Sequence, residues 1–196
     1  MKNLYLFILS FFLFVSCSDD ISPDKQGETG VFSIELTIPD DVRTRAYSDG
    51  STVNSIKCYV YDHDAGDNAL PFMTHDIEIK NVGSKRGNHY DFTFVKGKTY
   101  DLVFLATAVD QTNPDSKVYY NPTLRTLNVD YAASKTNDEE MDCFFGVLPN
   151  LSDKSEKALS VTLKRPFAQL NIGAKDLAKY NIQSVGVSVD GVYSSM

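Results

Sequence analysis

The stretch that decides the fold reads Val31-Phe32-Ser33-Ile34-Glu35-Leu36-Thr37-Ile38. Apolar residues occupy every second position, which is the period at which side chains point to one face of a β-strand. Pro39 follows directly and ends the run, because proline has no N–H for a strand ladder. The pattern therefore predicts a strand over residues 31–38 with one buried face, made of Phe32, Ile34, Leu36 and Ile38.

The rest of the chain continues in the same manner, with short apolar runs separated by turn-forming residues. Strand signals recur at residues 56–61, 73–79, 90–94, 100–106, 124–129, 143–147, 159–163, 168–173 and 182–189. Gly97-Lys98 and Asn121-Pro122 are typical of the turns between them. Only residues 174–180 have a helical pattern. Many short strands with almost no helix predict an all-β protein, an antiparallel β-sandwich.

The length and the charge of the chain limit the functions that it can have. The chain has 196 residues and a formal net charge of −7, which suits one domain with a sizeable core. The acidic balance argues against nucleic acid as a partner and against a polybasic contact with membranes. Besides Cys17 the chain has two cysteines, Cys58 and Cys143. They either form a disulfide or are two buried thiols, and both alternatives stay open.

The first residues have the layout of a bacterial signal peptide. Lys2 precedes an apolar run over residues 4–15, and Ser16 precedes Cys17. The run is too short to span a bilayer comfortably. Phe14-Val15-Ser16-Cys17 resembles the lipobox of bacterial lipoproteins, whose cysteine is acylated, although Phe14 replaces the usual leucine. Ser18-Asp19-Asp20 resembles the tag that directs Bacteroides-type lipoproteins to the outer face of the outer membrane.

We therefore expect a signal peptide at residues 1–16, a lipidated flexible tether at residues 17–30 and a β-sandwich at residues 31–196. The lipidation site is Cys17. Two acyl chains or more anchor a protein firmly, whereas one chain does so only marginally. A plain secretory peptide with an incidental cysteine is the alternative.

No sequence pattern indicates a catalytic site or a metal-binding site. Asp62, Asp64, Asp67 and Asn68 form an oxygen-rich group, but their spacing is not that of a calcium-binding loop. The acidic run at residues 137–142 is interpreted as a solvated loop. His63, His75 and His89 are scattered, and neither a nucleophile elbow nor a phosphate-binding loop occurs. We expect no enzyme activity, no metal and no cofactor.

Arg43 and Arg45 lie in a polar segment between the first two predicted strands. Exposed polar segments with basic residues are where proteases cut. The residues alone favour the simpler interpretation, which is a surface loop without a special role.

Several motifs resemble the fimbrillin-like lipoproteins of Bacteroides, the type V pilin superfamily that includes the FimA and Mfa types. The motifs on which this resemblance rests are Arg45-Ala46-Tyr47-Ser48-Asp49-Gly50, Tyr59-Val60-Tyr61-Asp62, residues 96–104, Phe144-Phe145-Gly146 and Leu163-Lys164-Arg165-Pro166-Phe167-Ala168-Gln169-Leu170-Asn171. The resemblance implies an exported lipoprotein with a transthyretin-like Greek-key sandwich. It also implies that a trypsin-like protease cuts after an arginine behind the first strand, which matches Arg45–Ala46. A strand of another subunit then replaces the departed one.

The energetics suit such an exchange. Burial of Phe32, Ile34, Leu36 and Ile38 contributes about 1.5–3 kcal/mol each, which together approaches the whole stability of a domain, about 5–15 kcal/mol. We expect a surface-exposed, lipid-anchored outer-membrane protein that acts as a fimbrial structural, accessory or adhesive subunit. Its expected partners are the outer membrane, through acylated Cys17, and other fimbrial subunits.

Two further expectations follow. The chain ends at Met196, before the second domain that family members usually have, and we expect either a truncated gene product or an accessory protein that never polymerises. In both cases the chain is expected to accept a strand without an evident strand to donate. The alternative function is a glycan-binding surface lipoprotein that does not polymerise. Tyr119-Tyr120 is its candidate aromatic platform.

Overall fold

The computed structural model describes residues 27–39, 50–82, 85–110, 113, 116–133, 135 and 138–166. Its strands are β1 (Thr29–Ile38), β2 (Ser55–Asp62), β3 (Met73–Glu78), β4 (Lys80–Val82), β5 (Lys85–Val95), β6 (Tyr100–Thr107), β7 (Val118–Asn121), β8 (Thr126–Val129), β9 (Cys143–Leu151) and β10 (Ala158–Thr162). Two 3₁₀ turns, η2 (His63–Ala65) and η3 (Glu139–Met141), complete the described elements. Within these ranges, no helix has the length and apolar character needed to cross a membrane.

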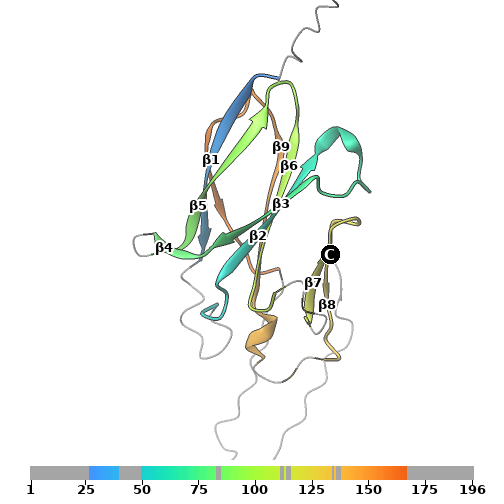
Figure 1. Cartoon of the computed structure of the whole chain (residues 1–196). Helices are drawn as coiled ribbons and strands as arrows, with labels where there is room; N and C mark the ends of the chain where they lie inside the picture. Colours follow the sequence, from blue (N-terminus) through green and yellow to red (C-terminus); the bar gives the residue numbers. More distant parts are fainter. Residues whose placement is uncertain are drawn as a thin grey trace, which may run out of the picture.

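Two four-stranded sheets form the sandwich, with strand orders β10-β1-β5-β4 and β3-β2-β6-β9 (Figure 1). We call them sheet A and sheet B. A separate pair, β7-β8, lies outside sheet B. All described strand pairs are antiparallel except β1 with β10, which is parallel. The predicted all-β sandwich is confirmed.

The chain passes between the sheets by a Greek-key path. β2 and β3 form a hairpin in sheet B, and one residue, Ile79, separates β3 from β4 in sheet A. β5 then runs antiparallel to β4, and β6 returns to sheet B beside β2. The return of a later strand to the side of the first is the defining step of a Greek key.

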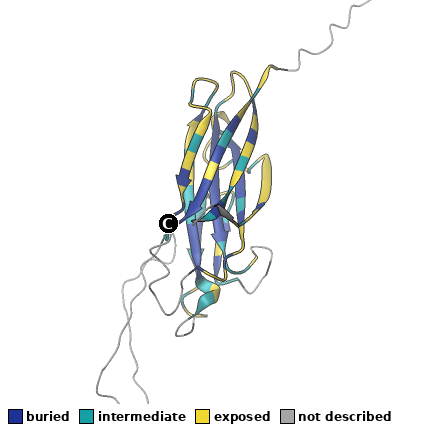
Figure 2. Ribbon diagram, turned by 90° about the vertical axis from the view of Figure 1, so that its left-hand side faces the viewer, coloured by how far each residue is buried: buried dark blue, intermediate teal, exposed yellow. Residues whose placement is uncertain are grey.

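Apolar side chains gather in two cores. The inner core fills the space between the sheets and contains the alternate residues of β1 together with those of β5, β6 and β10. The outer core lies between sheet B and the β7-β8 pair, where Tyr59, Tyr61, Val103 and Leu105 meet Tyr120 and Leu127. β2 and β6 are therefore buried on both faces, whereas the outer face of β1 has exposed positions (Figure 2).

The structure differs from the sequence prediction in several strands. β5 and β9 are longer than predicted, and β4 and β7 were not predicted. β8 begins at Thr126 instead of residue 124, because Asn121 Oδ1 accepts the N–H groups of Thr123 and Leu124 and holds a turn there. The predicted strands at 168–173 and 182–189 and the helical pattern at 174–180 lie outside the described residues.

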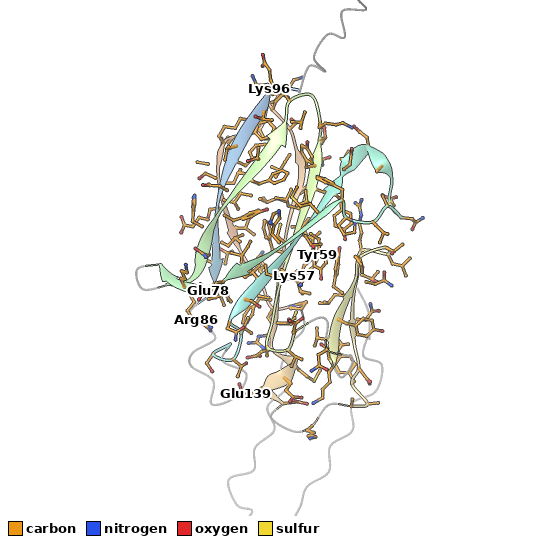
Figure 3. The ribbon with its side chains drawn as sticks, viewed as in Figure 1. Lys57, Tyr59, Glu78, Arg86, Lys96 and Glu139 are labelled. Atoms are coloured by element: carbon orange, nitrogen blue, oxygen red, sulfur yellow. The ribbon has the colours of Figure 1, made fainter. Side chains whose placement is uncertain are left out.

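β1 connects the two ends of the sandwich. Its first residue, Thr29, pairs with Val95 next to the β5–β6 turn, and its last residue, Ile38, pairs with Arg86. The end with the β5–β6 turn and the adjoining β2–β3 loop lies in the upper part of Figure 1 and is called the upper pole. The opposite end, where Arg86 pairs with Ile38 and contacts Gly50, is called the lower pole. In Figure 3, Lys96 marks the upper pole and Arg86 the lower one.

Candidate functional site: the first strand and its anchors

β1 occupies an interior position in sheet A, between β5 and β10. It pairs with β5 over all ten of its residues and with β10 over residues 33–37. A strand with partners on both sides uses the hydrogen-bonding groups of both edges. Sheet A therefore depends on β1, and its removal would separate β10 from β5.

The inner face of β1 consists of the four residues predicted from the alternating sequence. Phe32, Ile34 and Leu36 are fully buried and Ile38 nearly so. The Phe32 ring is stacked on Phe94 with 4.3 Å between centroids, and Lys157 Nζ lies 4.6 Å from the centroid of each ring. The packed core beneath β1 is therefore aromatic near the upper pole and aliphatic toward Ile38.

The outer face of β1 carries a polar cluster of serine, histidine and aspartate. Ser33 Oγ lies 2.6 Å from His89 Nε2 and donates to Asp91 Oδ1 over 2.8 Å, and Asp91 Oδ1 lies 3.0 Å from the same His89 nitrogen. A hydrolytic triad needs the serine and the aspartate on different imidazole nitrogens. The cluster therefore lacks triad geometry and links β1 to β5 on the exposed face.

Close backbone approach between β1 and β5 requires a glycine. A Cβ atom at Gly87 would lie 1.9 Å from the Leu36 carbonyl oxygen and 3.0 Å from Thr37 Cα. Gly87 pairs with Thr37 of β1 on one side and with Lys80 of β4 on the other. The absence of a side chain lets both neighbouring strands pair at this position.

Arg86 joins β1 to the chain beyond residues 40–49. Its backbone pairs with Ile38, and its guanidinium Nη1 and Nη2 donate to the carbonyl oxygens of Gly50 and Val53. The two stretches that flank residues 40–49 are thus both held by Arg86. A break in the chain between them would leave Gly50 and Val53 attached to the body of the protein.

A buried ion pair fixes the same corner from sheet B. Asp142 is fully buried, and its carboxylate accepts the Gly50 N–H over 2.7 Å and Arg165 Nη1 over 2.5 Å. The Arg165 guanidinium lies 4.9 Å from the centroid of the Phe144 ring. Because an unpaired buried carboxylate is costly, Arg165 and Asp142 are expected to be retained together.

Asp101 organises the upper part of sheet B. Its carboxylate accepts the Asn150 N–H over 2.9 Å, lies 3.0 Å from His63 Nδ1 and accepts Arg125 Nη1 over 3.3 Å. Burial alone would raise the pKa of Asp101, but the hydrogen bonds from Asn150 and His63 and the charge of Arg125 outweigh it and lower this pKa. Asp101 thereby holds the β2–β3 loop, the β7–β8 turn and β9 together.

The predicted site residues divide into two groups. Phe32, Ile34, Leu36 and Ile38 form one continuous buried face, as predicted. Cys17, the predicted lipidation site, and the predicted cleavage site at residues 45–46 lie outside the described residues. Lipidation and cleavage therefore stay predictions.

Cys58 and Cys143 are both free and buried. Cys58 belongs to the inner core and Cys143 to the outer core. Burial raises the pKa of Cys58 to about 12, a hydrogen bond with Tyr90 opposing it in part, and burial also raises the pKa of Cys143. Of the two alternatives, the structure supports buried thiols.

The acidic turn after β2 has local structural roles. Asp62 Oδ1 accepts the Asp64 N–H and so begins η2, and Asp62 Oδ2 pairs with Lys98 Nζ over 3.1 Å. In the part of the chain that the structure describes, no group of three or more His, Cys, Asp or Glu residues could hold a metal ion. The run at 137–142 differs from a solvated loop at its end, because Asp142 is buried.

The tyrosine pair does not form an aromatic platform. Tyr119 is exposed, but Tyr120 is buried in the outer core, its ring 4.7 Å from Tyr59 and its hydroxyl 3.1 Å from that of Tyr61. Successive residues of a strand point to opposite faces, so only one of the two rings reaches solvent. Nothing in this pair favours glycan binding.

Sequence reasoning missed Arg86, Asp101 and Asp142. Arg165 and Asp101 lie within the family motifs at residues 163–171 and 96–104. Membership in these motifs was the one sequence signal that could have indicated a role for either residue. Their partners could not be inferred, because Asp142 and Arg165 are 23 positions apart and Arg86 and Gly50 are 36 apart.

Comparison with known proteins gives a family and one similar structure. A protein family of unknown function, DUF6562, matches residues 23–194. No curated protein matches the chain. The crystal structure of a fimbrial assembly protein from Parabacteroides distasonis ATCC 8503 is similar, with a TM-score of 0.41 and 15% sequence identity, over 69% of this chain and 53% of that chain. The chain thus spans about half the length of that fimbrial assembly protein.

Proposed function

The chain belongs to DUF6562, a family of unknown function, and we propose that it is a lipid-anchored surface protein that serves as a fimbrial subunit by exchange of β1. In this proposal Cys17 carries the lipid, Arg45–Ala46 is cut, and the released strand is replaced by an extended segment of another subunit. The observation that supports it most is the interior place of β1, with four buried side chains at alternate positions.

Replacement of β1 by another strand is energetically favoured over its simple loss. Four buried side chains at about 1.5–3 kcal/mol each contribute as much as a domain's net stability. The loss of β1 would also leave unpaired edges on β5 and β10. An incoming strand restores both the apolar contacts and the ladder, which is binding by strand addition.

The arrangement of the ends suits cleavage behind β1. Arg86, Asp142 and Arg165 hold the corner at Gly50 on the body of the protein. A cut at Arg45–Ala46 would therefore separate β1 covalently without loosening Gly50. The cut chain would then retain β1 only through the contacts of the strand itself.

The first test is the intact mass of the protein recovered from the outer membrane. A chain that begins at acylated Cys17 has kept β1, as an anchor or a free lipoprotein would. A chain that begins at Ala46 has lost the lipid and the strand, as the proposal requires for a polymerising subunit.

The second test measures strand uptake. The purified chain is cut with trypsin and incubated with a labelled peptide of residues 29–38. The matched control is a peptide with serine at the positions of Phe32, Ile34, Leu36 and Ile38. We expect the first peptide to bind the cut protein and the control to remain free. A stable cut monomer that takes up neither peptide would contradict strand exchange.

A further inference from the structure

Exposed apolar side chains concentrate at the upper pole. Among the described residues, five of the large apolar side chains that are 37–65% exposed lie near this end of the sandwich, in the β2–β3 loop, at the start of β3 and on the outer face of sheet A: Val31, Leu70, Phe72, Met73 and Val95. Contiguous exposed apolar patches mark contacts with a protein or a membrane. We call these five residues the upper patch.

Contacts place Phe72, Val95 and Val31 near one another at the upper pole. The Phe72 ring lies 5.9 Å from the ring of Tyr100, whose hydroxyl accepts the Val95 N–H over 3.1 Å. Met73 follows Phe72 directly at the start of β3. Val31 pairs with Thr93, two residues before Val95, so Val31 and Val95 are diagonal neighbours on the outer face of sheet A. Buried Tyr100 therefore lies between the part of the patch at Phe72 and the part at Val95.

The chain reaches this same pole from its predicted anchor. β1 begins at Thr29 in the upper pole, and Gly27 follows Cys17 by ten positions along the chain. Ten residues span at most about 36 Å. A lipid on Cys17 would therefore keep the upper patch within reach of the bilayer, and a short linker raises the effective concentration of the second contact to the millimolar range.

We propose that the upper patch docks on the lipid bilayer and orients the anchored protein with its lower pole away from the membrane. This inference rests on the lipid anchor in the proposed function. β1 has ten residues and so spans about 33 Å. Docking by the upper patch would place Ile38, and the chain that follows it, that far from the docked end.

The charges near the patch identify the kind of contact. Lys96 pairs with Glu28 over 2.6 Å and Lys98 with Asp62 over 3.1 Å, so the lysines of the β5–β6 turn have acidic partners. The chain as a whole carries a net charge of −7. Attraction to anionic lipid is therefore not the driving force, and docking by apolar side chains should be insensitive to salt.

The absence of tryptophan from the chain makes a clean test possible. The full lipidated chain with Phe72→Trp is reconstituted in phosphatidylcholine vesicles and in the same vesicles made with brominated phosphatidylcholine. Tyr119→Trp is the matched control, because Tyr119 on β7 is 47% exposed and Phe72 is 53% exposed. Leu70→Trp is a second probe of the patch in case Phe72→Trp perturbs the fold.

We expect the emission of the Phe72→Trp and Leu70→Trp variants to shift to shorter wavelength and to be lost in brominated vesicles, equally at low and high salt. The Tyr119→Trp variant should keep its emission. If the chain floats with the vesicles but the patch variants are quenched no more than the control, docking is refuted while the anchor stands. A blue shift without bromine quenching that grows with protein density would identify a second copy as the occupant and would also refute docking. If the chain does not float with the vesicles, the anchor fails and docking fails with it.

Discussion

Replacement of Arg165 by methionine should destabilise the protein strongly, because it leaves the fully buried Asp142 without its cation. The 2.5 Å contact between Arg165 and Asp142 would be lost, together with the contact of Arg165 with the Phe144 ring. Removal of one member of a buried ion pair costs about 3–5 kcal/mol. The Arg165 side chain is 13% exposed, so the expected loss lies toward the lower end, about 3 kcal/mol.

A second substitution should recover part of that loss. In Asp142→Asn/Arg165→Met the side chain at 142 is neutral and can still accept the Gly50 N–H, which Asp142 accepts over 2.7 Å. We expect the double variant to be more stable than Arg165→Met alone, because the unpaired charge has gone. The two substitutions should couple by about 1–3 kcal/mol.

The assay is urea unfolding of the unlipidated chain, followed by circular dichroism, for the wild type, both single variants and the double variant. Lys98→Met is the control, because Lys98 forms a solvent-exposed pair with Asp62 and such pairs contribute little. The reasoning is refuted if Arg165→Met costs no more than Lys98→Met. It is also refuted if the double variant is destabilised by the full sum of the two single losses.

Three further predictions concern the core and its charges. Because the pKa of Asp101 is lowered in the folded protein, its contribution to stability is complete above the unfolded pKa of about 3.9 and is lost as the pH falls below it; urea midpoints at pH 7 and pH 3 should differ less for Asp101→Asn than for the wild type, and an unchanged difference would contradict this. Gly87→Ala should cost at least about 1–3 kcal/mol of unfolding free energy, since its Cβ would meet the Leu36 carbonyl oxygen at 1.9 Å; a wild-type urea midpoint would show that the strands do not approach so closely. Cys58 and Cys143 should resist iodoacetamide at pH 8 in the folded protein and react in urea, because both thiols are buried and their pKa values are raised; a mass without either adduct after unfolding would indicate a disulfide instead.

The strands that sequence reasoning found share one property, a periodic pattern that is visible within the strand itself. β1 shows this best, because its outer face is partly solvated and its inner face is wholly apolar. β7 was missed although Val118 and Tyr120 are buried and Tyr119 is exposed, since four residues hold too little of a period to recognise. β4, with three residues, is recognisable only through its pairing with β5.

The apolar residues of the candidate site were predicted from the sequence, whereas the charged residues that anchor it were missed. Alternation alone identified Phe32, Ile34, Leu36 and Ile38 as one face. The anchors at the lower pole depend on contacts such as Arg86 with Gly50 and Arg165 with Asp142, whose members lie on different strands or loops. A charged residue looks the same in a sequence whether it is solvated or buried against a partner, so these pairs had no local signal.

The sequence by itself determined that the chain forms short strands, which of their faces are apolar, and that β1 ends before Pro39, because backbone geometry and side-chain period act over a few neighbouring residues. Only the tertiary structure decided that β1 lies between β5 and β10, that Ile34 stands beside Leu159 in a parallel pair, and that Asp142 is buried against Arg165. These choices depend on which distant surfaces fill a shared core, and that is a property of the whole packed chain.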